Sequence, residues 1–166
     1  MCVTSAVVYG IIHDQFTARI CVEYFTVGHP PVFATDNPTV LGIGWGIIAT
    51  WWVGVLLGVP LAVCARSGRR PKLSPSELVR PLLILLASLG ILAFLAGAAG
   101  HFAAERDLVR LLEPMASRVP AARHVAFITS LWTHLASYLG GFVGGVVICA
   151  WALKRRTQQA IALSVR

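Results

Sequence analysis

Three long stretches of this chain contain no Asp, Glu, Lys or Arg, and they constrain the fold more than any other feature. They are Thr39 to Ala65, Pro81 to Gly100 and Val125 to Leu153. A helix needs about 20 mainly apolar residues to cross a hydrocarbon core about 30 Å thick. Each stretch is therefore long enough to span a membrane. With 57% hydrophobic and only 13% charged residues, the chain also falls outside the composition of soluble globular domains.

The apolar opening of the chain, Met1 to Ile12, predicts a fourth membrane helix. Those residues alone rise only about 18 Å, which is too little to cross. No proline occurs before Pro30, so a helix that continues to about Phe25 would be long enough. In the alternative, residues upstream of the given start complete the span. Both alternatives place His13 and Asp14 on the same side of the membrane.

The sequence therefore predicts an all-α fold, a polytopic membrane protein with a bundle of four transmembrane helices. We expect one domain over residues 1–166, with helices at about 1–27, 38–65, 78–112 and 120–153. The third includes an interfacial extension, because Phe102 to Glu113 keeps a helical pattern with mixed charges. Asn37 before Pro38 is a typical helix start, and Ser74 with Glu77 forms a capping box.

The basic residues are distributed unevenly over the connections. Nine follow the second or the fourth helix: Arg66, Arg69, Arg70, Lys72, Arg80, Lys154, Arg155, Arg156 and Arg166. The other five are Arg19, Arg106, Arg110, Arg118 and Arg123. Cytoplasmic loops carry an excess of Lys and Arg, so we expect both termini in the cytoplasm, in a bacterial inner membrane. The net charge of +7 then needs anionic lipid headgroups as its partner rather than nucleic acid.

Glycines recur on the second and fourth helices. Small residues let membrane helices approach closely, so we interpret these positions as helix-packing faces. They are Gly42, Gly46, Gly54, Gly58, Gly140, Gly141, Gly144 and Gly145. The partner of each face is either the other glycine face or another chain, in a homo-oligomer or a larger membrane complex.

All five histidines fall on the predicted outward side, and several polar residues accompany them. Ionisable residues within a membrane are costly and by default indicate function. The candidate ligand-binding residues are His13, Asp14, Thr17, Glu23, His29 and His134. On a helix, Asp14 and Thr17 share one face with Cys21, because their spacings are three and four.

The first third of the chain carries a specific block of residues. It comprises Tyr9, Gly10, His13, Asp14, Thr17, Ala18 and Arg19, the run Glu23-Tyr24-Phe25-Thr26-Val27-Gly28-His29-Pro30, and then Gly44-Trp45-Gly46 and Ala49-Thr50-Trp51-Trp52. This block resembles a family of small bacterial four-helix membrane proteins of no known activity. The resemblance implies the same topology and no particular chemistry.

A second constellation, His101 and Glu105, has the spacing of four at which two side chains on a helix can share a metal ion. A third ligand would have to come from another helix, and the outward-side candidates are His13, Asp14, Glu23, His29 and His124. A divalent metal is therefore a candidate cofactor. Haem is not expected, because His134 and its candidate opposite ligands lie at different predicted depths.

Two classes of function remain open from the sequence. In the first, a histidine and acid cluster on the outward side binds an ion, a metal or a small ligand, and this class requires His13, Asp14 and His101 to lie near one another. In the second, the protein is a structural or accessory subunit of a membrane complex that packs through its glycine faces. No catalytic motif points to an enzyme.

Overall fold

The computed structural model describes residues 1–165, and Arg166 lies outside the described residues. Within that range the chain is helical and contains no strand. The helices are α1 (Cys2–Ile20), α2 (Glu23–Thr26), α3 (Pro38–Ile48), α4 (Trp51–Arg66), α5 (Pro75–Glu105), α6 (Met115–Arg118) and α7 (His124–Ser164), with a 3₁₀ turn at Ala121–Arg123. Asn37 caps α3 by accepting from the amides of Thr39 and Val40, and the predicted capping box opens α5.

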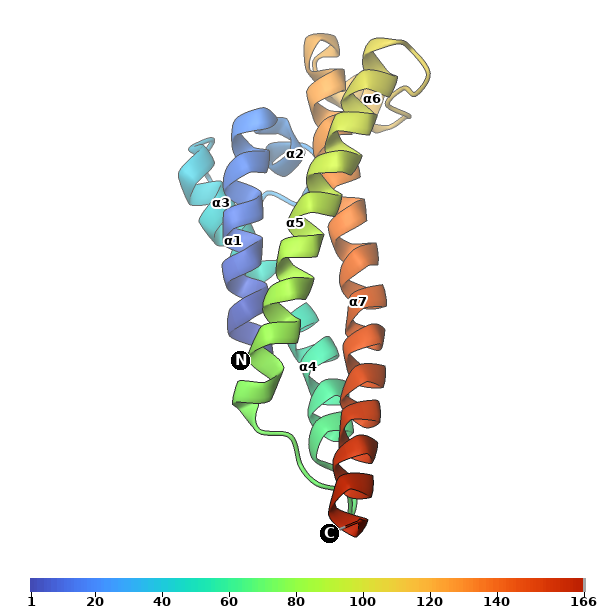
Figure 1. The fold of residues 1–166 in the computed structure, drawn as a ribbon. Helices are drawn as coiled ribbons and strands as arrows, with labels where there is room; N and C mark the ends of the chain where they lie inside the picture. Colours follow the sequence, from blue (N-terminus) through green and yellow to red (C-terminus); the bar gives the residue numbers. More distant parts are fainter. Residues whose placement is uncertain (166) are drawn as a thin grey trace.

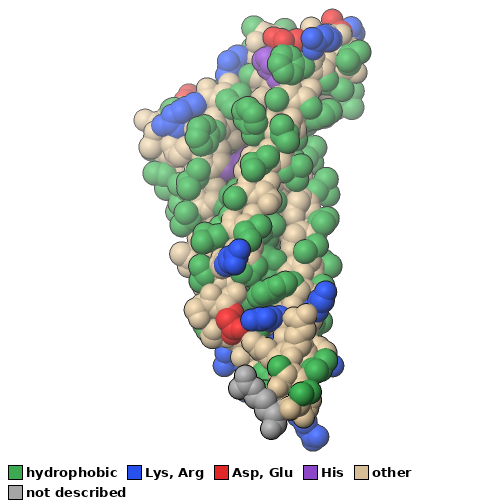
Figure 2. Space-filling model, viewed as in Figure 1, with side chains coloured by type: hydrophobic (Ala, Val, Ile, Leu, Met, Phe, Trp, Pro, Cys, Tyr) green, Lys and Arg blue, Asp and Glu red, His purple; other side chains and the backbone are tan. Residues whose placement is uncertain are grey.

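Three helical segments of the described residues are long and apolar enough to cross a membrane: Pro38–Arg66, Pro75–Glu105 and Ala121–Ser164. Most of their residues are not buried inside the protein. Hydrophobic side chains accordingly lie over much of the face in Figure 2, while charged ones are concentrated at the top and in the lower half. An apolar exterior of this length suggests a membrane protein. The helix α1 is not among these three segments.

The helices form two layers that meet along α4 and α7. Helix α1 packs against α3 and α4, whereas α5 packs along the length of α7 (Figure 1). Helix α4 also packs against α7 and so joins the layers, but α1 and α5 scarcely touch. A cavity that lies between them is described below.

Two helices end earlier than predicted, and each end has a physical cause. Helix α1 stops at Ile20 rather than near residue 27, because Cys21 adopts an extended conformation with φ −151° and ψ 95°, and the guanidinium of Arg123 donates to the freed Ile20 carbonyl at 2.9 Å. Helix α5 stops at Glu105 rather than at residue 112. There Asp107 adopts a left-handed conformation with φ 56°, and the amide of Leu108 bonds back to the carbonyl of Ala103, as in a Schellman motif.

The other boundaries also differ in part from the prediction. The second predicted helix is interrupted between α3 and α4, where Thr50 has φ −121°. The last helix continues past the predicted end near residue 153 to Ser164. Its extra turns carry polar residues and lie beyond the apolar segment, at the lower end of Figure 1.

The glycine faces are turned into the monomer. Gly42, Gly46, Gly54 and Gly58 contact α1, and at Gly46 an added Cβ would lie 2.5 Å from the Ile11 backbone. On α7, Gly140 and Gly144 contact leucines of α5, and Gly145 contacts Leu57 of α4. The two glycine faces therefore pack against other helices rather than against each other. Gly141 differs, since an added Cβ would meet no atom within 4 Å.

Candidate functional site

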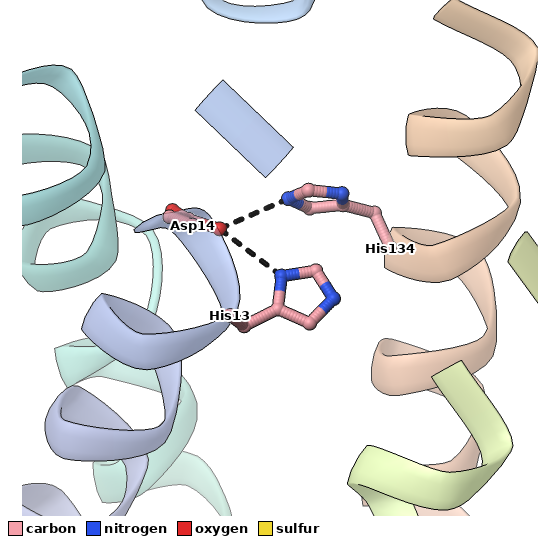
Figure 3. Close-up of side chains that lie close together, drawn as sticks. All are labelled: His13, Asp14 and His134. Carbon is pink, nitrogen blue, oxygen red and sulfur yellow. Dashed lines mark hydrogen bonds and ion pairs between the residues drawn. The ribbon is translucent and has the colours of Figure 1, made fainter. Parts of the chain in front are cut away.

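Three of the predicted residues meet where α1 faces α7. The Nδ1 atom of His13 lies 3.2 Å from Oδ1 of Asp14, and Nε2 of His134 lies 3.1 Å from the same oxygen. Figure 3 shows both rings turned towards the Asp14 carboxylate, one from the same helix and one from across the bundle. We call these three residues the His–Asp–His cluster.

The cluster is enclosed by protein. Asp14 is 4% exposed and His134 is 8% exposed. The ring of Tyr24 lies against His134 with centroids 4.4 Å apart, and the rings of His13 and His134 meet edge to face, also at 4.4 Å. Below them, the hydroxyls of Tyr9 and Ser137 hydrogen-bond at 2.9 Å. The site is thus a small group of buried polar side chains inside an otherwise apolar helical bundle.

The second ring nitrogen of His134 determines where its proton lies. Nδ1 is 2.9 Å from the backbone carbonyl of Ser130. A carbonyl only accepts, so Nδ1 carries a hydrogen. In a neutral ring Nε2 would then point its lone pair at the Asp14 carboxylate. Two acceptors 3.1 Å apart repel one another unless a cation lies between them. The geometry therefore requires either a proton shared between Nε2 and the Asp14 carboxyl group, or a metal ion.

The cluster has the composition and spacing of a metal site. One ligand atom from each of the three residues lies within 4.8 Å of the others, and no other group of this kind occurs among residues 1–165. Zinc binds imidazole nitrogens and carboxylate oxygens at about 2.0–2.2 Å. Small rotations of the side chains would bring all three atoms onto one ion. The bond from His134 to the Ser130 carbonyl is the outer contact that ligating histidines normally make.

The remaining ligand candidates of the first helix and its cap lie nearby but not in the cluster. Thr17 is buried, and its hydroxyl donates to the His13 carbonyl at 3.3 Å. The Nδ1 atom of His29 is 2.8 Å from the Tyr24 carbonyl, and its ring packs against Trp45. Thr17 therefore bonds to the α1 backbone beside the cluster, and His29 packs among the aromatic side chains near it.

Glu23, the first residue of α2, forms an ion pair with Arg123, which immediately precedes α7. Its carboxylate accepts from Nε of Arg123 at 3.0 and 3.1 Å, and the Cys21 thiol donates to it at 3.3 Å. Burial would raise the pKa of Glu23, but the bonds from its own amide and from Arg123 outweigh this and lower it. Arg19 does not contact Glu23 and bonds instead to Gln15 and Thr39.

The predicted metal ligands His101 and Glu105 on α5, and His124 at the start of α7, do not join the cluster. His101 pairs with Glu105 at 3.3 Å on the surface and lies 3.4 Å from the hydroxyl of Thr129. His124 caps the preceding turn, with Nε2 2.9 Å from the Val119 carbonyl. The predicted proximity of His13 and Asp14 to His101 is therefore not found, and His134 lies there instead.

The depth argument against haem does not hold, since His13 and His134 lie level with each other. Their rings nevertheless touch, which leaves no gap for a haem plane between them. Two contacts of the site were not predicted from the sequence: the Tyr24 ring beside His134 and the Ser130 carbonyl that binds its Nδ1. The aromatic character of Tyr24 was a usable signal, whereas a backbone carbonyl carries none.

The fold and this cluster define an all-helical protein with a buried His–Asp–His site. Comparison of the chain with family models, with curated proteins and with solved structures found no match.

Proposed function

We propose that this protein is an integral membrane protein that binds a divalent transition metal ion of the Zn²⁺ type at the His–Asp–His cluster. The observation that carries the proposal is the convergence of three ligand atoms from α1 and α7 on one buried point. Two imidazoles and one carboxylate suit zinc and neighbouring divalent ions. Helical bundles build metal sites in this way, from side chains on facing helices.

The membrane location of α1 is part of the proposal. Its exposed side chains include Val8, Ile12 and Phe16, which follow one another at a spacing of four and so form a single apolar stripe. A stripe of this kind facing outward supports contact with lipid, which makes α1 the fourth membrane helix. The distribution of basic residues supports cytoplasmic termini and a bacterial inner membrane. The cluster then lies in the outward half of the bundle.

In this proposal, protons and the metal compete for the same positions. Without metal, a proton on Nε2 of His134 balances the Asp14 carboxylate, which is 3.1 Å away. The metal replaces that proton, so its binding releases protons to the solvent. Protons alone would also satisfy both contacts, with Nδ1 of His13 donating to the same Asp14 oxygen, and metal titration separates the two possibilities.

The accessory-subunit alternative receives less support. It requires glycine faces that are free to meet another chain, whereas the glycines of α3, α4 and α7 that make contacts are packed inside the monomer. We therefore retain metal binding as the single proposed function.

The test is metal content and metal titration of the full chain purified in detergent without chelator. Near-stoichiometric zinc in the purified protein, or a tight Co²⁺ site with a visible absorption spectrum, is the expected result. His134→Gln should abolish the site. His101→Gln is the matched control, because His101 lies outside the cluster and its loss should change nothing. Equal binding by both variants, or none by the unaltered chain, would refute the assignment.

A further inference from the structure

A narrow cavity begins at the His–Asp–His cluster and runs along the inside of the bundle. Its volume is about 120 Å³, and its lining extends from His134 to Ile148 on α7 and from Asp14 to Cys2 on α1. At 1.5 Å per residue, the stretch of α7 is about 21 Å long. That length exceeds half of the hydrocarbon core, which is about 15 Å. The cavity is therefore a channel for a thin, extended molecule rather than a chamber for a compact one.

The channel changes character along its length. Near the cluster it is lined by the polar side chains of Tyr9, Ser137 and Tyr138. Farther along, its walls are apolar and include Leu57, Leu61, Leu82, Leu85, Leu86 and Leu89. A molecule that fits must therefore have one polar end and a long hydrocarbon remainder.

One glycine keeps the channel open. Gly141 lies on α7 in the channel wall and is buried, yet an added Cβ would meet no atom within 4 Å. Most other glycines of the bundle are in close contact with a neighbouring helix. The space beside Gly141 is thus room inside the protein that helix packing does not use.

The channel lies beside a seam between helices. Both α1 and α5 line it, but these two helices scarcely touch each other. In a membrane, a seam between two apolar helices faces lipid, so a hydrocarbon chain can enter sideways without crossing water.

We propose that this channel binds one long-chain fatty acid, with its carboxylate as a further ligand of the metal ion and its tail along α5 and α7. The inference rests on the proposed metal site. It follows from charge complementarity, because a divalent ion with the Asp14 carboxylate has a net charge of +1. A second carboxylate brings the buried site to neutrality, which an apolar surrounding favours. Neither a zwitterionic headgroup nor a hydrocarbon without an anionic end does this.

The experiment uses the full chain loaded with Co²⁺ in detergent, and oleate as the probe. Carboxylate binding to the ion should change the visible Co²⁺ spectrum and saturate at one oleate per protein. Methyl oleate has the same chain without the anion and should leave the spectrum unchanged. Gly141→Leu should fill the channel and weaken the oleate response at least tenfold, while Co²⁺ still binds. Gly90→Leu is the matched control, since Gly90 is exposed and also has open space at its Cβ.

A second measurement does not depend on either variant. A fatty acid with a photoreactive group in mid-chain should label channel residues such as Leu86 and Gly141, and unlabelled oleate should compete. Labelling confined to residues on the lipid-facing surface, such as Phe94, would overturn the proposal. So would an oleate response that is unchanged in Gly141→Leu.

The two proposals fail in different ways. If Co²⁺ binds but oleate neither alters its spectrum nor labels the channel, the fatty acid proposal is wrong and the metal site stands. If the unaltered chain binds no Co²⁺ or Zn²⁺, the proposed function itself is wrong, and the fatty acid proposal falls with it.

Discussion

The protein buries charge at two places, and the surroundings of the two charges differ. Asp14 is 4% exposed and faces two histidine rings at the head of a cavity. Arg156 is 2% exposed, and its guanidinium donates to four backbone carbonyls at 2.6–3.0 Å, those of Cys64, Ser67, Arg70 and Pro71.

The difference between the partners distinguishes a candidate binding site at Asp14 from a structural contact, the brace, at Arg156. Carbonyls cannot change their protonation state or turn towards a ligand, so Arg156 holds the end of α4 and the following loop in one geometry. The partners of Asp14 are side chains that can exchange a proton for a metal ion. Burial of a charge alone therefore does not indicate function, whereas burial among groups with unused ligand capacity does. The variants below test that contrast.

The largest effect is expected for Asp14→Asn. The amide keeps the shape of the side chain and removes its charge, so Co²⁺ or Zn²⁺ affinity should fall more than about 100-fold, beyond the loss caused by an outer contact. Stability should fall less than for an ordinary broken ion pair, because His134 can lose its extra proton once the Asp14 charge is gone, so no buried charge is left without a partner. Isothermal titration and thermal unfolding in detergent measure the two quantities. Undiminished affinity would show that Asp14 is no ligand.

Arg156→Met should give the opposite pattern. Methionine fills much of the same space but leaves four carbonyls without their donor, and each of them that water cannot reach costs about 1–3 kcal/mol. We expect a clear fall in the unfolding midpoint together with unchanged metal affinity at the distant cluster. Arg155→Met is the control, because Arg155 is the exposed neighbour on the same helix. If the two variants unfold alike, the brace is not needed.

A smaller effect is expected at the wall of the site. The Tyr24 ring lies 4.4 Å from the His134 ring, centroid to centroid, and so limits its rotation. Tyr24→Leu should weaken metal binding about tenfold, at the lower end of the range for groups that orient a ligand. Tyr24→Phe keeps the ring and should bind like the unaltered chain. A loss in both variants would mean that the hydroxyl, rather than the ring, matters.

The sequence predicted the helices more completely than the pairing of their side chains. Segment length and the absence of charge are local properties, and they identified the three long apolar helices. His13, Asp14 and His134 were each singled out, but their meeting joins positions 120 apart in the chain. It depends on how far α1 is displaced along α7. Arg123 helps to fix this position by bonding to the end of α1. No local sequence pattern predicts such a contact between helices, so the sequence favoured His101 as much as His134 as a partner of Asp14.

The smallest effect is expected for the ion pair between Arg123 and Glu23. Arg123 is more than a third exposed, so its pair with Glu23 should contribute no more than about 1 kcal/mol. The pKa of Glu23 is lower in the folded protein than its ordinary value. The pair therefore stabilises the fold fully above the unfolded-state pKa of a glutamate, and its contribution is lost as the pH falls through the folded-state value. Glu23→Gln should lower the unfolding midpoint slightly at neutral pH and make no difference in acid. An equal deficit at both pH values would show that the packing of this side chain matters rather than its charge.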